Sequence, residues 1–550
     1  LRAHCMVACS SQNNSNSNAN PAGLIGACWV GAASALLVLP WLNPFTWGPV
    51  APLLQWLGTA LALAGLLGLG ALWRVVGRPR PAPWACAMAA GWLLAGVLSS
   101  LMGLLQYLGH SAGWSLWVNV TPAGEAFANL RQRNQFATLT NMALASLCWL
   151  VWAAKPTASH GRQSALLPWL AVGLAVLLGM GNAASASRTG LVQLGLLLAL
   201  GWWWGGWRHA GVGRVLLAAV LAYGLALVLL PVLIGQSPLT GGALARLQQD
   251  APACTSRLVL WRNVLELIAQ RPWLGWGWGE LDYAHFMHLY AGGPDDRFCA
   301  ILDNAHNLPL QLAVELGLPF ALLLCGLAAW AVWRGRPWRE ADPTRQLAWA
   351  VLALIGLHSL LEYPLWYGPF LLAAGLCGWL LWWPPRWVVP AVVQAGLACG
   401  LLAATAWVGW DYFRISQLYL RPSDRAPAYR HDPMAMVGGS VLFGDQVRFA
   451  MLSTTPPAAA HARAGLGMAQ DLLHFSPEPR VIERVVEYAS LLGQDDLVAA
   501  HMLRYRAAFP EEFAVWSAQN KAVAQALRLP AEVGASVAAS GAASGVGKTP

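Results

Sequence analysis

Charged residues are scarce in this sequence: Asp, Glu, Lys and Arg together make up 11% of 550 residues. A soluble protein of this length carries about 25% charged residues, because its surface must be hydrated. The composition therefore excludes a cytosolic enzyme, a disordered protein and a fibrous protein. Hydrophobic residues make up 57% of the chain and the mean hydropathy is +0.48. These values predict an all-α polytopic membrane protein.

Motifs for metal and nucleotide chemistry are also missing. The sequence has no His-Glu-x-x-His, no Cys-x-x-Cys and no phosphate-cradling P-loop. His285 and His288, followed by Asp295 and Asp296, form a poor set of metal ligands. We therefore expect no cofactor and no metal. The net charge of +9 is not interpreted as a nucleic-acid footprint, because most of it is expected in cytoplasmic loops.

Apolar runs of about 20 residues, the length that crosses a bilayer, predict the number of membrane spans. Eleven candidates are found, at roughly 22–40, 50–73, 82–107, 135–154, 165–184, 189–207, 213–235, 308–333, 346–362, 365–383 and 388–410. Basic residues collect in cytoplasmic loops, and 12 of them fall on one side of this arrangement against three on the other. The pattern predicts that the N-terminus lies inside and the C-terminus outside.

The spans divide the chain into four predicted parts. Residues 1–20 form a polar, disordered lead, and residues 21–410 form the transmembrane domain with a long outer loop at 236–307. Residues 411–529 form an outer helical domain, in which 481–492 and 496–508 resemble a tetratricopeptide-type hairpin. Residues 530–550 are rich in Ala, Gly and Ser and are expected to be disordered.

Two of the ten cysteines, Cys254 and Cys299, fall in the long outer loop. An oxidising compartment permits a disulfide between them, and we expect that bridge. The alternative is a pair of unrelated thiols.

Three residues at the predicted outer membrane boundary have complementary chemistry: Arg188, Arg257 and His306. Each has an ordinary structural interpretation, since a lone Arg at a span end is usually a membrane anchor and a lone His usually packs or caps. Together they suggest a site, because two guanidinium groups can hold a pyrophosphate. A neutral imidazole can take a proton from an attacking hydroxyl group.

Other polar residues on the outer side are weaker candidates. Gln132 and Asn134 precede the fourth predicted span and could bind sugar hydroxyls. His358, Glu362 and Tyr363 lie at the outer end of the ninth span, where a carboxylate needs a partner. We include all five as candidate substrate-binding residues.

Several of these segments resemble a known family. Ser-Arg-Thr-Gly at 187–190, Arg-Leu-Val-Leu-Trp at 257–261 and Asn-Ala-His-Asn at 304–307 resemble the O-antigen ligase superfamily of bacterial inner membranes. Arg-Gln-Arg-Asn-Gln at 131–135 and His-Ser-Leu-Leu-Glu-Tyr-Pro at 358–364 are similar to its protein-glycosylating branch, the pilin-glycosylation ligases.

This resemblance implies a metal-independent, GT-C-like glycosyltransferase in the inner membrane whose site faces the periplasm. The donor would be an oligosaccharide on undecaprenyl pyrophosphate, and the acceptor a Ser or Thr hydroxyl of a pilin or another periplasmic protein. His306 would be the general base, Arg188 and Arg257 would hold the pyrophosphate, and Gln132 and Tyr363 would shape the site. An alternative is a ligase acting on lipid A-core or an O-antigen polymerase, and a less favoured one is a transporter of a lipid-linked solute.

Overall fold

The computed structural model describes residues 21–45, 48–50, 52–75, 83–154, 161–239, 253–291, 296–382 and 389–520. The predicted lead at 1–20 and tail at 530–550 lie outside these residues. All regular structure in the described part of the chain is helical, which confirms the all-α prediction. The chain forms two compact units, residues 1–250 with 327–410 and residues 251–326 with 411–550. The outer loop therefore groups with the C-terminal helices.

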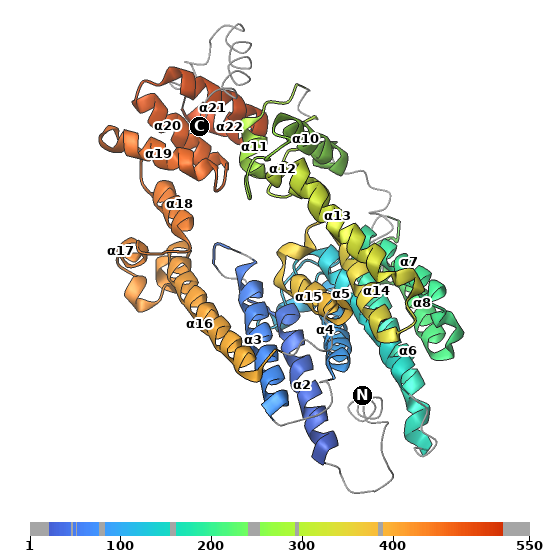
Figure 1. The fold of residues 1–550 in the computed structure, drawn as a ribbon. Coiled ribbons are helices and arrows are strands. Elements are labelled where there is room, and N and C mark those ends of the chain that lie inside the picture. Colours follow the sequence, from blue (N-terminus) through green and yellow to red (C-terminus); the bar gives the residue numbers. More distant parts are fainter. Residues whose placement is uncertain are drawn as a thin grey trace. The chain divides into compact units, whose positions relative to one another are not determined.

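The first unit is a bundle of apolar helices (Figure 1). Its helices are α2 (Pro21–Leu42), α3 (Leu53–Val75), α4 (Trp84–Tyr107), α5 (Arg133–Ala153), α6 (Gly161–Ala184), α7 (Arg188–Trp203), α8 (Ala210–Leu233), α14 (Pro343–Ser359), α15 (Gly368–Trp382) and most of α16 (Ala391–Ser416). The buried core includes Trp41, Trp92, Phe136 and Phe370. Small residues let the helices approach closely: a Cβ added to Gly179 of α6 would lie 2.4 Å from the carbonyl oxygen of Ala219 in α8.

Among the described residues, eight helices are long and apolar enough to cross a membrane. This confirms a multi-span membrane protein, but it does not reach the eleven spans predicted from the sequence. The three predicted spans at 189–207, 346–362 and 365–383 correspond to α7, α14 and α15, which have 16, 17 and 15 residues. Helices α7 and α15 are shorter than the predicted spans because the apolar runs include residues that the structure places in turns. Helix α14 has the length of its predicted span but begins and ends three residues earlier.

The predicted continuous span at 308–333 is wrong. The structure divides it into α12 (Leu308–Leu316) and α13 (Leu318–Gly335), separated by Gly317. Gly317 has φ +84°, a conformation that ends an α-helix and that glycine adopts at little cost. The membrane candidate therefore begins at Leu318, and α12 precedes it as a separate helix.

The second unit is built from the outer loop and the C-terminal helices. The loop contributes α10 (Arg257–Gln270) and α11 (Leu281–Met287), and α12 and the start of α13 follow it in the same unit. After the end of α16 come α17 (Pro433–Val437), α18 (Gly444–Thr454), α19 (Ala462–Leu473), α20 (Pro479–Leu491), α21 (Asp495–Ala508) and α22 (Pro510–Gln519). The helices expected at 481–492 and 496–508 are present as α20 and α21, joined at Gly493 with φ +66°. Their relation to tetratricopeptide repeats stays a prediction.

Two apolar cores stabilise this second unit. One lies between α10 and α12 and includes Leu260, Val264 and Ala313. The other belongs to the C-terminal helices and also buries Phe286 of α11. The outer loop and the C-terminal helices, far apart in the sequence, therefore share one hydrophobic core.

Candidate active site

In the first unit, Gln132 and Asn134 lie at the start of α5. The side-chain oxygen of Gln132 accepts a hydrogen bond from the backbone N–H of Gln135 at 2.8 Å, so Gln132 is the N-cap of the helix. The preceding residue, Arg131, has φ +60°, which is uncommon for a residue with a side chain. Both predicted residues are therefore fixed where the outer segment turns into α5.

Asn134 joins three elements of the bundle. Its amide Nδ2 donates to Glu362 Oε1 at 3.0 Å, and its Oδ1 accepts from Ser187 Oγ at 2.5 Å. Ser187 in turn is the N-cap of α7, accepting from the Gly190 N–H at 2.9 Å. Glu362 is buried, with 6% of its surface exposed. The sequence predicts that this carboxylate needs a partner, and the structure shows the Asn134 amide as one.

One helical turn further along α5, Thr138 belongs to a second set of polar side chains, with Gln193 and His358, and all three are buried. Thr138 Oγ1 lies 2.9 Å from His358 Nδ1 and 3.1 Å from Gln193 Oε1. Gln193 donates from Nε2 to the Leu354 carbonyl at 2.9 Å. His358 has no exposed surface. Its surroundings favour a role in positioning α5, α7 and α14, whereas Tyr363 is only half-buried and stacks beside Tyr367 at 5.9 Å between ring centroids.

Arg188 is the first residue of α7 and its side chain is exposed. It follows the N-cap Ser187, and two residues before it Ala186 has φ +51°. A helix N-terminus presents unpaired N–H groups and a partial positive charge. The guanidinium group of Arg188 adds a full charge at the same end, which suits an anionic ligand.

In the second unit, Arg257 repeats this arrangement. It is the first residue of α10 and follows the N-cap Ser256, whose Oγ accepts from the Val259 N–H at 3.3 Å. Just before it, Cys254 forms a disulfide with Cys299, with 5.3 Å between their Cα atoms. The predicted pairing is therefore present, and it ties the start of α10 to the segment that leads to His306.

His306 lies directly before the N-cap of α12. Asn307 caps the helix by accepting from the Leu310 N–H at 3.1 Å, with Pro309 in the first turn. The N–H of His306 donates to Asn304 Oδ1 at 3.2 Å, and its φ is +49°. Non-glycine residues in this region carry strain of about 1–3 kcal/mol, which often marks a functional position. The side chain is half-buried.

The starts of α10 and α12 are held side by side. Trp261, one turn after Arg257, donates from Nε1 to the carbonyl of Ala305 at 3.1 Å, and Ala305 directly precedes His306. Residues four apart share one helix face. Arg257 therefore lies on the face of α10 that adjoins the His306 segment.

A carboxylate also lies near His306. Desolvation raises the pKa of Asp303, although its side chain keeps contact with solvent, and the nearby His306 opposes that shift. Among the described residues, no group of three or more His, Cys, Asp or Glu side chains could hold a metal ion.

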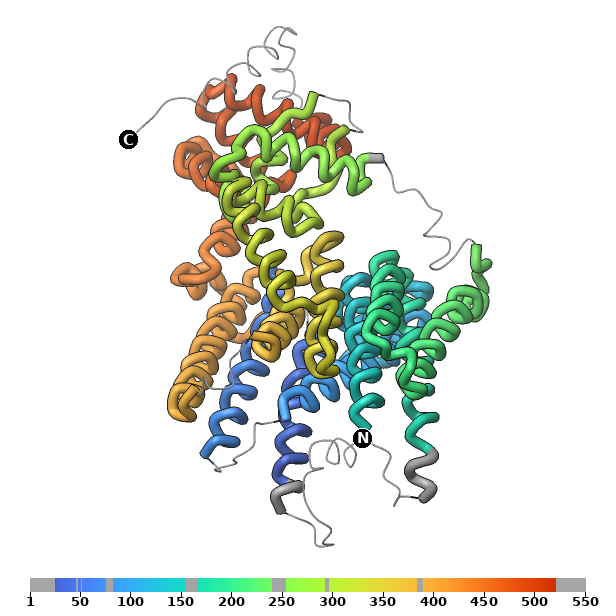
Figure 2. The backbone as a smooth tube through the Cα atoms, turned by 45° about the vertical axis from the view of Figure 1, so that its right-hand side comes forward, coloured from blue at the N-terminus to red at the C-terminus, as the bar shows by residue number. Residues whose placement is uncertain are grey.

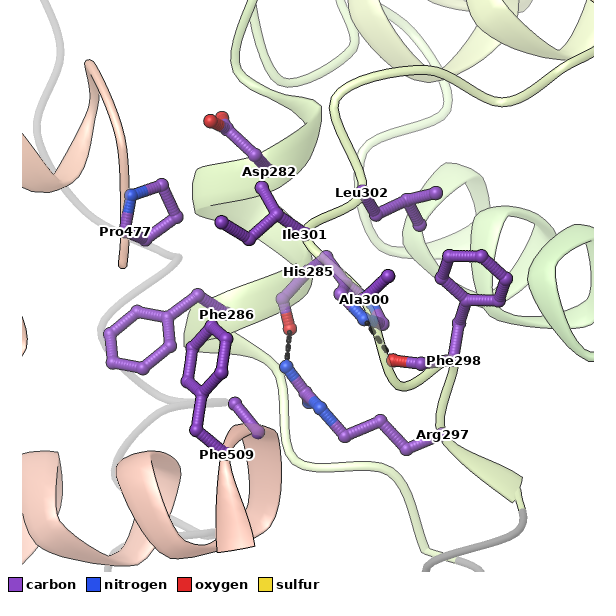
Figure 3. Close-up of a pocket in the computed structure, with 11 residues that line it drawn as sticks. Asp282, His285, Phe286, Arg297, Phe298, Ala300, Ile301, Leu302, Pro477 and Phe509 are labelled. Carbon is purple, nitrogen blue, oxygen red and sulfur yellow. Dashed lines mark hydrogen bonds between the residues drawn. The ribbon is translucent and has the colours of Figure 1, made fainter. Parts of the chain in front are cut away.

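A small pocket lies between the outer loop and the C-terminal helices of the second unit. Figure 3 shows Arg297 extending toward the carbonyl group of His285, with Pro477 and Phe509 across the pocket. Arg297 Nη2 donates to that carbonyl oxygen at 2.9 Å. Burial lowers the pKa of His285 to about 3 and raises that of Asp282 to about 7. These titratable groups were not predicted as site residues, because nothing in the sequence relates this loop to the tail.

Three family models match separate segments of the chain. They are a protein glycosylation ligase model at 126–151, an O-antigen ligase model at 173–325, and a model of the C-terminal part of virulence factor membrane-bound polymerases at 346–524. Separate parts of the chain are therefore similar to O-antigen ligases and to protein glycosylation ligases.

These matched segments contain the predicted site. The protein glycosylation ligase segment includes Gln132 and Asn134, and the O-antigen ligase segment includes Arg188, Arg257 and His306. A curated relative, the General O-oligosaccharyltransferase of Acinetobacter baylyi (strain ATCC 33305 / BD413 / ADP1), is 27% identical over 336 residues. The alignment covers 58% of this chain and 56% of the relative, so the chain spans little more than half of that protein. No solved structure matches the chain.

Proposed function

We propose that this protein transfers an oligosaccharide from undecaprenyl pyrophosphate to a Ser or Thr hydroxyl group of a pilin or another periplasmic protein. The similarity to a general O-oligosaccharyltransferase supports this activity. The observation that carries the proposal is the placement of Arg257 and His306 at the starts of two helices that Trp261 holds together. A cation for the leaving group and a base for the acceptor are thus presented from one side of α10 and α12.

The reaction is a single displacement with inversion. The acceptor oxygen forms a bond to the anomeric carbon while the bond from that carbon to the donor phosphate breaks. The imidazole of His306 takes the hydroxyl proton, and undecaprenyl pyrophosphate leaves with the bonding electron pair. Arg188 and Arg257 hold the pyrophosphate as its charge grows, and preorganised cations of this kind are usually the largest catalytic contribution.

In the first unit, Gln132 and Tyr363 shape the donor site, while Asn134, Glu362 and His358 hold the helices that carry Arg188. Asn134 and Glu362 do so through Ser187, the N-cap directly before Arg188. This division follows from burial, since His358 and Glu362 are enclosed by protein whereas Arg188 is exposed. No metal or cofactor takes part in the proposed reaction.

The proposed setting is the bacterial inner membrane, with eleven spans, the N-terminus in the cytoplasm and the site facing the periplasm. The eight long helices supply most of these spans, and α7, α14 and α15 supply the other three. Such short helices can cross where the bilayer thins locally or flanking residues reach the interface.

Purified protein in liposomes, given a labelled lipid-linked oligosaccharide and a Ser-containing pilin, tests the function. We expect label on the pilin as a Ser- or Thr-linked glycan. Label only on lipid A-core, or growth of the lipid-linked chain, would instead establish the ligase or polymerase alternative. Movement of donor between leaflets with an unmodified acceptor would establish a transporter.

A further inference from the structure

The segment from Arg271 to Gly279, which we term the tryptophan loop, exposes large apolar side chains. Trp273 is 75% exposed, Leu274 86% and Trp278 63%. Trp276 in the same loop turns inward and donates from Nε1 to the Leu267 carbonyl at 2.9 Å. The loop therefore has a packed side and an apolar side that no described part of the second unit covers.

The tryptophan loop is fixed to the junction between α12 and α13. The N–H groups of Trp276 and Gly277 donate to the carbonyls of Val314 and Glu315, at 2.8 and 2.9 Å. The N–H of Leu318 donates to the Pro272 carbonyl at 2.8 Å. These bonds satisfy backbone groups at the helix break, which explains why α12 ends there.

Glycines make this contact close enough. A Cβ on Gly317 would lie 2.2 Å from the Trp273 carbonyl oxygen, and a Cβ on Gly275 would lie 2.3 Å from that of Glu315. Both glycines have positive φ, +84° and +70°. The loop and the junction therefore form one rigid piece whose position relative to Leu318 is set.

Leu318 is also the first residue of a candidate membrane span. The span Leu318–Arg339 has only 6% of its most apolar window buried within the protein, and its first two turns expose Phe320, Leu322 and Leu323. In Figure 2 this helix, in yellow-green, continues directly from α12. The tryptophan loop is thus attached at the N-terminal end of this candidate span.

We propose that the tryptophan loop inserts Trp273 and Leu274 into the membrane interface beside Leu318. Tryptophan is enriched at this depth because its ring is apolar and its N–H can reach water. Arg271, whose guanidinium carbon lies 4.0 Å from the Trp276 ring centroid, is placed to meet lipid phosphates. The ligand of this surface is the bilayer itself.

The insertion also sets the height of His306 relative to the bilayer, and the importance of that height rests on the proposed function. The loop contacts the C-terminal end of α12, while His306 precedes its N-terminal end. Nine helical residues span about 13 Å. Helix α12 would therefore act as a spacer that holds His306 on the water side of the tryptophan loop, facing the diphosphate of a lipid-linked donor.

The test is a depth measurement on the full-length protein in liposomes. All cysteines except Cys254 and Cys299 are replaced by alanine, and Leu274→Cys is labelled with an environment-sensitive fluorophore. Leu258→Cys is the matched control, because Leu258 is a leucine of similar exposure, 77%, at the opposite end of α10. Trp273→Cys provides a second site in case one variant folds poorly.

We expect the label at 274 or 273 to be blue-shifted and quenched by lipids that carry a nitroxide near the headgroup. The label at 258 should be quenched by iodide from the water phase. Iodide quenching at 274 and 273 as strong as at 258, without quenching by the nitroxide lipids, would overturn the proposal. Fluorescence does not depend on glycan transfer, so this result is independent of whether the proposed function holds.

Discussion

The two units contain the same dipeptide at a helix start, and they support it differently. Ser187 and Ser256 each cap a helix whose first residue is an arginine, Arg188 or Arg257. In the apolar bundle, Ser187 belongs to a buried network with Asn134 and Glu362. In the second unit, Ser256 follows a disulfide-bonded cysteine and α10 packs on an apolar core.

This difference follows from the surroundings. Hydrogen bonds are stronger where the local dielectric is low, and there an unpaired polar group is costly. In the helix bundle, a network of buried side chains can therefore hold Ser187, the residue before the exposed Arg188. In the loop, water competes for hydrogen bonds, and a disulfide and an apolar core hold the start of α10 in place instead. The same arrangement, an arginine after a capping serine, is thus held in place by two kinds of interaction.

The largest expected effect concerns the proposed base, His306, which lies in the second unit. His306→Ala should reduce glycan transfer by about 10²–10⁴-fold, since that is the usual contribution of general base catalysis. The initial rate of transfer to an acceptor pilin measures this effect. His461→Ala, at an exposed position of the tail, is the control and should transfer normally. A His306→Ala rate close to wild type would remove the assigned base.

The next largest effect is expected from Arg188 and Arg257, one in each unit. Arg188→Ala and Arg257→Ala should each lower the transfer rate by about 10²–10³-fold, the usual cost of one lost electrostatic contact to the transition state. Arg262→Ala is the control on α10, because Arg262 makes an exposed ion pair with Asp296. A loss confined to one of the two arginines would show that the matching local structures have different roles.

Removing the disulfide tests the covalent support of the second unit. Replacing Cys254 and Cys299 together by serine should lower stability by about 2–4 kcal/mol, because the bridge closes a long loop. Thermal unfolding of the purified protein measures the change, with the exposed Cys399 replaced by serine as control. An unchanged melting temperature would show that the apolar core alone fixes α10.

Alanine variants of the two capping serines compare how much the buried network and the disulfide-bonded segment each depend on the cap. Ser256→Ala should cost about 1 kcal/mol, the usual value of an N-cap. Ser187→Ala should cost about 0.5–1.5 kcal/mol more, because Asn134 also loses a hydrogen bond. Thermal unfolding in nanodiscs compares the two, and Ser187→Thr should restore most of the loss. Equal costs for both alanine variants would contradict the support assigned to the network.

The smallest effect is a pH dependence confined to the second unit. Burial raises the pKa of Asp282 to about 7, so the folded protein holds this proton more tightly than the unfolded chain. Its contribution to stability is complete at low pH and is lost as pH rises through about 7. Asp282→Asn should therefore flatten the fall in melting temperature between pH 5 and pH 8. Parallel curves for the two proteins would show that Asp282 titrates normally.

Much of the fold could be predicted from composition and apolar runs, because both reflect the membrane as solvent. The division at Gly317 could not, since it depends on backbone bonds from the tryptophan loop, 40 residues earlier in the chain. The lengths of α7 and α15 were overestimated because apolar residues continue into turns, whereas α14 has the predicted length and lies three residues earlier.

The candidate site was predictable where chemistry depends on local sequence. The sequence predicts Arg188, Arg257 and His306 as candidate residues near the ends of helices, and the structure has each of them at a helix start. The Cys254–Cys299 pair followed from its location in one loop. The bonds from Asn134 to Ser187 and Glu362 were missed, because they join residues 53 and 228 positions apart.

A double-mutant cycle on the transfer rate tests most directly whether the two units act on one donor. It compares Arg188→Ala, Arg257→Ala and the double variant with the wild type. Residues that bind the same pyrophosphate are coupled, so the double variant should lose much less than the product of the two single losses. A loss equal to that product would mean that Arg188 and Arg257 act independently, which would contradict the shared site.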